Sequence, residues 1–183
     1  MHRHAFVTAA AFLAPVVGLL AQQSRQIDLP FKLTWGESSE RIEKMIRGAA
    51  AKVTNRRLER GGIEAWEVEG IAVEALRKTL FRFQNEQLVG LELQYRGPTD
   101  SNGRETWSEE RYADFMGRWR RNLDQQYGSG QLITRKTGAE GDVSQTLSGY
   151  RWTLGNTTVD LICFTAERGP ERFQTLSVHY RLF

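Results

Sequence analysis

Residues 91–96, Leu91-Glu92-Leu93-Gln94-Tyr95-Arg96, have a close counterpart near the other end of the chain, Leu176-Ser177-Val178-His179-Tyr180-Arg181. Both stretches alternate apolar and polar residues, and both end in Tyr-Arg. A period of two is typical of a β-strand that buries one face. Each stretch comes after a helix-like segment and three strand-like segments. The sequence therefore predicts an α+β protein in which a helix followed by four strands occurs twice.

Two segments have the apolar spacing of a helix that covers a sheet. Residues 38–50 place apolar side chains three and four residues apart, with Ser38 as the expected N-cap. Residues 107–127 do the same over a longer stretch, where Thr106 and Glu109 are expected to form a capping box and Gly128 to end the helix. The side chains expected to be buried are Ile42, Met45, Ile46, Phe115, Met116 and Trp119.

Strands are expected where the apolar period shortens to two and turn residues interrupt the chain. They cover residues 52–58, 63–70, 78–84 and 87–96 after the first helix, and residues 131–137, 144–154, 157–166 and 171–182 after the second. Short connections such as Gly61-Gly62 and Gly155-Asn156 indicate antiparallel hairpins. We therefore expect one or two antiparallel sheets, with one face covered by the helices.

Further matches between the two sets favour an internal duplication. Thr34-Trp35 precedes the first helix and Thr106-Trp107 precedes the second, and the second strand of each set contains a tryptophan, Trp66 or Trp152. These anchors occur in the same order. They predict repeat units at residues 34–97 and 106–183, joined by a linker at 98–105 and preceded by an N-terminal segment at 22–33. Because the two units can share a core and join their sheet edges, residues 22–183 are expected to form one compact domain.

This tandem of helix-plus-four-strand units resembles the architecture of the β-lactamase inhibitor protein family, in topology, over residues 31–183. One unit alone is similar to small outer-membrane assembly lipoproteins. The resemblance implies an antiparallel α+β fold in a secreted protein. It implies no site residues, because no family motif is present. The inhibitors carry disulfides, which a chain with one cysteine cannot form internally, and the lipoproteins need an acylated cysteine, which is absent.

The first 21 residues have the pattern of a cleavable signal peptide. Arg3 supplies a positive charge, residues 5–21 contain no charged side chain, and the sequence turns polar at Gln22. The apolar run is shorter than the roughly 20 residues that span a bilayer, and Pro15 interrupts it. We therefore expect cleavage near Ala21 and export to the periplasm or the medium, with an uncleaved anchor as the alternative.

The composition limits the classes of partner and of chemistry. The chain has 25 basic and 22 acidic residues, and the two signs are interleaved along it. This distribution is typical of a solvated surface, so no nucleic-acid partner is expected, and no transmembrane segment is expected in the mature chain. The single cysteine, Cys163, lies in an apolar strand-like run and is expected to be a buried small side chain.

The common catalytic motifs do not occur in the sequence. After residue 21 there is one histidine, His179, which excludes a histidine-rich zinc site. The sequence has no P-loop, no dinucleotide-binding glycine pattern and no nucleophile elbow. We therefore expect no metal, no cofactor and a non-enzymatic function.

The alternation in the strands places one set of polar side chains on the sheet face opposite the helices. Charged and amide groups held on rigid strands can recognise a protein with little loss of conformational entropy. We therefore expect an exported binding module of the cell envelope, whose ligand is a protein or another envelope component. The candidate binding residues are Glu67, Glu69, Arg82, Gln84, Glu92, Gln94, Arg96, Arg151, Ser177, His179 and Arg181.

Two alternatives stay open at this point. Glu67 and Glu69 share a strand face, and with His179 they could perform general acid–base chemistry in a small hydrolase if burial raised the pKa of one carboxyl. The polar face could also be only the solvated side of a structural domain. A deep pocket with convergent carboxylates would favour the enzyme, and a broad concave sheet would favour binding.

Overall fold

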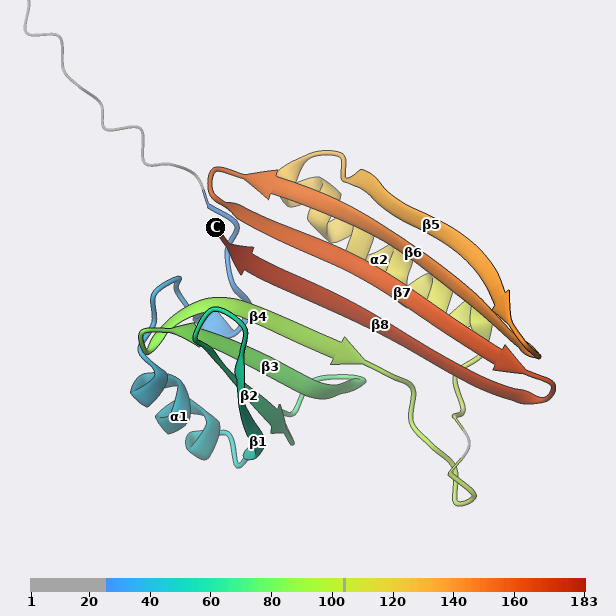
Figure 1. Ribbon diagram of the computed structural model, residues 1–183, viewed down its shortest axis with the longest axis horizontal. Coiled ribbons are helices and arrows are strands. Elements are labelled where there is room, and N and C mark those ends of the chain that lie inside the picture. Colours follow the sequence, from blue (N-terminus) through green and yellow to red (C-terminus); the bar gives the residue numbers. More distant parts are fainter. Residues whose placement is uncertain (1–25, 104) are drawn as a thin grey trace, which may run out of the picture.

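The computed structural model describes residues 26–103 and 105–183, so the expected signal peptide at residues 1–21 lies outside the described residues. Within these ranges the protein is α+β, with two α-helices and an eight-stranded antiparallel sheet (Figure 1). The elements are η1 (Pro30–Lys32), a short 3-10 helix, α1 (Ser39–Gly48), β1 (Lys52–Glu59), β2 (Ile63–Glu69), β3 (Leu76–Gln84), β4 (Gln87–Tyr95), α2 (Glu109–Tyr127), β5 (Gln131–Glu140), β6 (Val143–Leu154), β7 (Thr157–Arg168) and β8 (Glu171–Leu182).

The strands form one continuous sheet in the order β1-β2-β3-β4-β8-β7-β6-β5. The two matching stretches, 91–96 and 176–181, lie on β4 and β8 and pair with each other at its centre. Leu91 opposes Tyr180, and Tyr95 opposes Leu176. The two sets of four strands therefore join through their last strands instead of packing as separate sheets. This pairing leaves β1 and β5 as the two edges.

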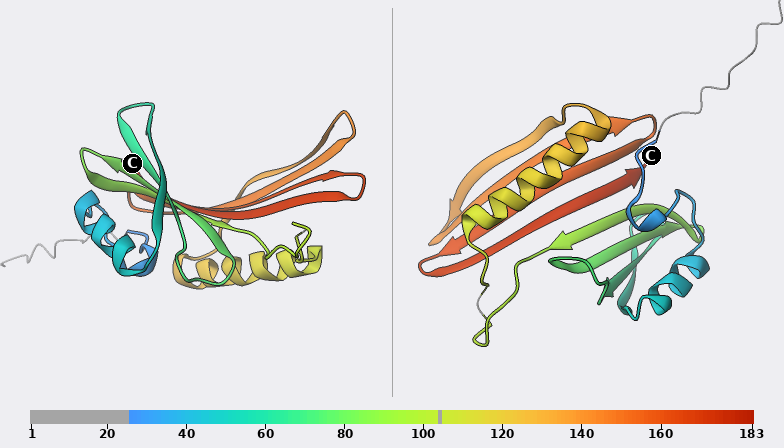
Figure 2. Two further views of the ribbon diagram at one scale, coloured as in Figure 1. Left: turned by 90° about the horizontal axis from the view of Figure 1, so that it is seen from below. Right: turned by 180° about the vertical axis from the view of Figure 1, so that it is seen from behind.

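Both helices lie on the same face of the sheet. The left view of Figure 2 shows α1 and α2 below the strands, while both ends of the sheet curve upward, away from the helices. Antiparallel strands twist relative to their neighbours, and over a wide sheet this twist accumulates into such curvature. The opposite face is therefore concave and is not covered by either helix.

The hydrophobic core fills the space between the sheet and the two helices. Ile42 and Ile46 of α1 and Phe115 of α2 are buried in it, as the helical spacing predicted. Met45, Met116 and Trp119 also pack against the core but keep part of their surface exposed. The sheet contributes alternate apolar side chains from both halves, including Trp66, Val68, Phe81, Leu91, Leu93, Trp152, Val159, Leu161, Leu176, Val178 and Tyr180.

The helix ends follow their caps, with one difference from expectation. Ser38 caps α1, because its hydroxyl accepts a hydrogen bond from the backbone N–H of Arg41. Gly128, with φ at 84°, ends α2 as expected. The predicted capping box at the start of α2 is wrong: Ser108 is the N-cap, and the hydroxyl of Thr106 donates to the carbonyl oxygen of Pro98. A serine nearer the first helical turn therefore replaces the threonine.

The segment before α1 has a role that the apolar pattern did not predict. Ile27 is fully buried, and its backbone N–H donates to the hydroxyl of Thr157 on β7 at 2.8 Å. The indole of Trp35 donates to the carbonyl oxygen of Ile27 at 2.8 Å. The start of the first half of the chain is thus attached to the second half of the sheet.

Candidate functional site

Two neighbouring rows of side chains cross the concave face at right angles to the strands. Residues that oppose each other in register project from the same face of a sheet. The first row runs through Arg57, Ala65, Arg82, Gly90, Arg181, Thr158 and Thr153. The second row runs through Asn55, Glu67, Leu80, Glu92, His179, Asp160 and Arg151. Arginines occupy alternate strands of the first row, and acids occupy alternate strands of the second.

This arrangement builds a set of interlocked ion pairs that we call the charged band. The small residues of the first row leave room for the long arginine side chains. A Cβ added at Gly90 would meet the Cβ of Arg82 at 3.3 Å and its Cδ at 3.5 Å. The charged band consists of Arg57, Glu59, Glu67, Lys78, Arg82, Glu92, His179, Asp160, Arg151 and Arg181.

The part of the band from β1 to β4 is balanced in charge, with three cations facing three acids. The carboxylate of Glu67 pairs with Arg57 and accepts a hydrogen bond from Lys78 Nζ at 2.7 Å. Arg82 bridges two acids, with Nε 3.1 Å from Glu59 and Nη2 3.0 Å from Glu92. The hydrogen bond from Lys78, with help from Arg57, lowers the pKa of Glu67 below its ordinary value despite burial. Glu67 is therefore ionised, with Lys78 and Arg57 as its positive partners.

The centre of the band lies on the β4–β8 pair. The Glu92 side chain is 9% exposed and accepts a hydrogen bond from the amide of Gln94 at 2.7 Å. Burial would raise the pKa of Glu92, but the nearby His179, Gln94 and Arg82 together lower it. Burial also lowers the pKa of His179, in spite of the attraction of Glu92. His179 is therefore neutral at neutral pH, where its Nε2 lies 2.8 Å from the hydroxyl of Ser177.

The part of the band on β6, β7 and β8 has an excess of positive charge. The side chain of Asp160 is 1% exposed, and both of its oxygens accept hydrogen bonds from Arg151, at 2.6 and 2.7 Å. Arg181 approaches the same carboxylate from the neighbouring strand. The hydrogen bond to Asp160 raises the pKa of Arg151. Two guanidinium groups thus share one buried carboxylate.

Three of the residues that the sequence singled out are neither members of the band nor hydrogen-bonded to one. Glu69 is exposed at the end of β2, and Gln84 is exposed at the turn between β3 and β4. Arg96 follows β4, where its Nε lies 3.2 Å from Glu105 and its guanidinium group lies 4.6 Å from the ring centre of Phe173. The remaining candidates, Glu67, Arg82, Glu92, Gln94, Arg151, Ser177, His179 and Arg181, lie in the band or next to it.

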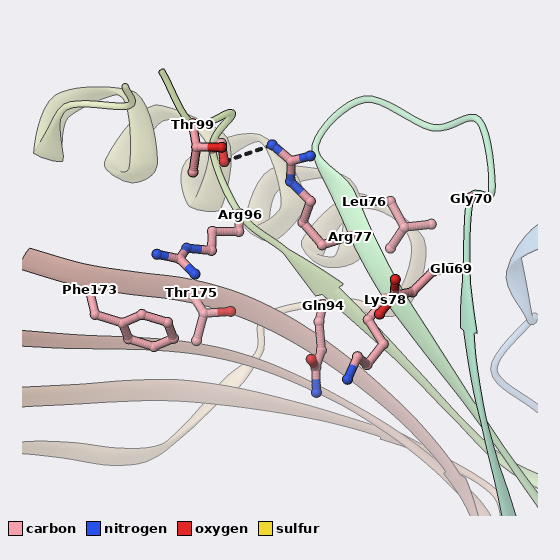
Figure 3. Close-up of a pocket in the computed structure, with 11 residues that line it drawn as sticks. Glu69, Gly70, Leu76, Arg77, Lys78, Gln94, Arg96, Thr99, Phe173 and Thr175 are labelled. Atoms are coloured by element: carbon pink, nitrogen blue, oxygen red, sulfur yellow. Dashed lines mark hydrogen bonds between the residues drawn. The ribbon is translucent and has the colours of Figure 1, made fainter. Parts of the chain in front are cut away.

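An open pocket of about 610 Å³ lies beside the band and contains Glu69, Gln94 and Arg96 in its lining (Figure 3). In Figure 3 the side chain of Arg77 reaches the loop after β4, where it donates to the carbonyl oxygen of Gly97 at 2.9 Å. Lys78 and Arg96 also line this pocket, but each is already paired with a glutamate. The pocket therefore offers mainly cations that are already partnered, in a hollow that is open to the solvent.

Sequence reasoning missed four members of the band: Arg57, Glu59, Lys78 and Asp160. The alternation in residues 157–166 could have identified Asp160, because Thr158, Asp160 and Ile162 alternate with the buried Val159 and Leu161. Lys78 lies an even number of residues from Arg82 on β3, and Arg57 lies two residues from Asn55 on β1, so each shares a sheet face with that polar neighbour. The pairing that makes these residues one unit depends on strand order, which the alternation of a single strand does not contain.

The residues of the hydrolase hypothesis are not brought together. Glu67 lies on β2 and His179 on β8, with β3 and β4 between them. At about 4.8 Å between neighbouring strands, three steps correspond to roughly 14 Å. A general acid also needs a raised pKa, whereas the pKa of Glu67 is lowered. In this arrangement Glu67 and Lys78 act as an ion pair.

Outside the charged band, the described part of the chain contains one thiol and no metal-binding cluster. Cys163 is half-buried, the amide of Gln174 lies 3.5 Å from its sulfur, and burial raises the pKa of its thiol. Residues 26–103 and 105–183 contain no group of three or more histidine, cysteine or acidic side chains placed to hold a metal ion. No helix in these ranges is long and apolar enough to cross a membrane.

Comparison with known proteins identified no relative. No protein-family model matches the chain, and neither a curated protein nor a solved structure matches it.

Proposed function

We propose that this protein is a non-enzymatic binding module whose concave sheet face recognises a protein or another component of the cell envelope. The observation that carries the proposal is the charged band, which runs from β1 to β6 on the face that neither helix covers. Side chains fixed in advance lose little conformational entropy when a partner binds, so their interaction energy is available for recognition.

The interlocking of the band distinguishes it from an ordinary solvated face. Isolated surface ion pairs contribute about 0–1 kcal/mol and leave long side chains free to move. Here Arg82 bridges Glu59 and Glu92, and Arg57 bridges Glu59 and Glu67, so several side chains hold one another in place. Charges that are held in fixed positions favour partners with complementary charges and disfavour partners with like charges.

A blocking substitution tests the proposal. Ser177 lies at the centre of the concave face, opposite Gln94, so Ser177→Trp places a bulky ring over the band. Asp114→Trp places the same ring on an exposed position of α2 on the other side of the molecule and serves as the matched control. The purified domain and both variants are used as bait in an envelope extract, and bound proteins are identified by mass spectrometry.

The proposal expects a partner that the wild type and Asp114→Trp both capture and that Ser177→Trp loses. Circular dichroism and a thermal melt establish that both variants are folded. If Ser177→Trp is folded and retains every partner of the wild type, the concave face is not the binding surface.

We also propose that the protein is exported and that residues 1–21 act as a cleaved signal peptide. The support is the sequence pattern: a positive start, an apolar run and a polar stretch from Gln22. Expression of the full chain with a C-terminal tag, followed by N-terminal sequencing of the exported fraction, tests this. A mature N-terminus at Gln22 is expected, and an intact Met1 on exported material would contradict cleavage.

An internal duplication is the third part of the proposal. Residues 91–96 match residues 176–181 at a constant offset, and the observed register has the same symmetry: Leu91 opposes Tyr180 and Tyr95 opposes Leu176, on either side of the Leu93–Val178 pair. Two equivalent strands related by a local two-fold axis pair in this way. If the units are equivalent, a fragment of residues 106–183 is expected to dimerise through β8, which light scattering would detect. A folded monomeric fragment would contradict equivalence.

A further inference from the structure

We propose that Arg151 and Arg181, clamped by Asp160, form an anion site on the concave face that receives a carboxylate side chain of a protein partner. The inference rests on the proposed function of the concave face and names the chemistry of one contact. Among the ion pairs described above, this is the place where two arginines share a single buried acid.

The geometry fixes both guanidinium groups and leaves part of each open. Arg151 uses Nε and Nη2 on the two oxygens of Asp160, at 2.6 and 2.7 Å, and Arg181 uses Nη2 on one of the same oxygens. The side chains of Arg151 and Arg181 are nevertheless 36% and 43% exposed. A guanidinium group has five N–H donors, so donors remain on both groups after Asp160 is satisfied.

We call Arg151, Asp160 and Arg181 the clamp. Two polar atoms in it or next to it have no hydrogen-bond partner within the described residues. They are Arg181 Nε and the hydroxyl oxygen of Thr158, and both atoms are buried. Thr158 is 2% exposed and directly opposes Arg181 in register, on the same face. Buried polar groups without a partner are uncommon in native proteins and are costly. An oxygen ligand bound between the arginines would be close to these donors.

The charge count favours a carboxylate over a phosphate. Two arginines and one aspartate, Arg151, Arg181 and Asp160, together carry a formal charge of +1. The neighbouring His179 adds no charge at neutral pH. One carboxylate balances this charge, whereas a phosphoryl group brings about −1.5 to −2. In contrast, the cations Arg57, Lys78 and Arg82 already face Glu59, Glu67 and Glu92. The two parts of the band therefore differ in their capacity for an added anion.

A titration with small probes tests the site without any knowledge of the partner. The arginine Nε–Hε resonances of the ¹⁵N-labelled protein are followed while acetyl-tetraglutamate amide is added at constant ionic strength. Acetyl-tetraglutamine amide is the uncharged control, and inorganic phosphate is a separate arm. Arg82 is the internal control, because it belongs to the same band but bridges two acids.

The expected result is saturable shifts of Arg151 and Arg181 with tetraglutamate and much smaller shifts of Arg82. Arg181→Gln leaves the bidentate hydrogen bond between Arg151 and Asp160 intact and removes the excess positive charge. It should weaken the binding of tetraglutamate about tenfold or more, as the loss of a charge-assisted hydrogen bond does. Arg168→Gln removes an exposed arginine outside the band, which pairs with Asp142, and should leave the affinity unchanged.

Three results would overturn the inference: absence of shifts at Arg151 and Arg181 in the wild type, equal weakening by Arg168→Gln and Arg181→Gln, or tighter binding of phosphate than of tetraglutamate. The wild-type titration decides the first even if a variant does not fold. Failure here, with partner capture lost in Ser177→Trp, leaves the proposed function standing. Tetraglutamate binding with capture retained in Ser177→Trp supports the anion site and contradicts the proposed function.

Discussion

At the scale of single residues, the contacts around Asp160 predict that removal of one arginine costs little stability and removal of both costs much. The carboxylate is 1% exposed, whereas the two arginines reach the solvent. Arg181→Gln should cost less than about 1 kcal/mol, because the bidentate Arg151 still neutralises the acid. The double variant Arg151→Gln, Arg181→Gln should cost roughly 3–5 kcal/mol, because it leaves a buried charge unpaired. Urea unfolding measures both values, and a double variant as stable as the single one would contradict the clamp.

His179 predicts a dependence of stability on pH. Burial lowers its pKa in the folded state, so below the unfolded value of about 6.5 the unfolded chain binds more protons than the folded one. The free energy of unfolding should therefore fall as the pH decreases from about 6.5 towards the folded pKa. The groups facing the imidazole are Glu92, Ser177, Arg82, Arg181 and Asp160.

The variant His179→Gln isolates this contribution. Between pH 7.5 and 5 its free energy of unfolding should decrease less than that of the wild type. Glu92 has a lowered pKa, so the loss of stability that its protonation causes begins at a lower pH than the loss caused by His179. Identical pH profiles for the two proteins would show that the charge of His179 is tolerated.

The residue types on the concave face could be predicted from the sequence, but their pairing could not. Strand alternation places Glu92 and His179 on the polar side without any knowledge of their neighbours. The contact between them requires β4 to lie beside β8, and these strands are far apart in the chain. Asp160 was missed because its neighbours in the sequence, Val159 and Leu161, are apolar and favour a buried strand. Its two arginine partners come from strands on either side.

At the scale of elements, the turn from α2 into β5 depends on a close approach between a glycine and an indole ring. Trp152 donates its indole N–H to the carbonyl oxygen of Gly128 at 2.9 Å, and the ring lies against Gly130. A Cβ at Gly130 would come within 2.4 Å of the ring carbons. Gly130→Ala should therefore cost about 1–3 kcal/mol through overpacking.

Gly138, on the strand β5 that follows Gly130, provides the matched control. Nothing lies within 4 Å of a Cβ added there, and its backbone is not in the left-handed region. Gly138→Ala should leave the midpoint of thermal unfolding unchanged or slightly raised. Equal effects of the two substitutions would show that the ring of Trp152 moves aside without cost.

The positions of the helices and strands could be predicted closely, because each depends on local periodicity. The largest difference is at β5, which continues to Glu140, beyond the expected end at residue 137. The short helix η1 and the buried segment around it were not predicted. Their apolar residues, Ile27, Leu29 and Leu33, occur with the period of a strand, but the segment forms none of the strands of the sheet, and they are buried where it meets other parts of the chain.

At the scale of the whole molecule, the halves are joined in two ways. The β4–β8 pair makes one sheet of the two sets of strands, and a single core includes side chains from both. The N-terminal segment adds a second connection, since Ile27 bonds to Thr157 and Asp28 donates its N–H to the hydroxyl of Tyr127. One sheet and one core that include both sets of strands favour a single cooperative transition. The order of the elements could be predicted from local patterns, whereas the contacts that connect the two sets could not.

This connection predicts how the molecule unfolds. Ile27 is fully buried, so Ile27→Ala should cost about 2–5 kcal/mol through lost burial and a residual cavity. Because the residue contacts both halves, the loss should shift the whole transition and not split it. Tryptophan fluorescence and far-UV circular dichroism should therefore give coincident urea curves for the wild type and for the variant. Leu58→Ala, at a position 77% exposed on the edge strand β1, is the control and should change stability by less than about 0.5 kcal/mol. Two separated transitions in Ile27→Ala would mean that the halves fold independently and that the N-terminal segment only joins them.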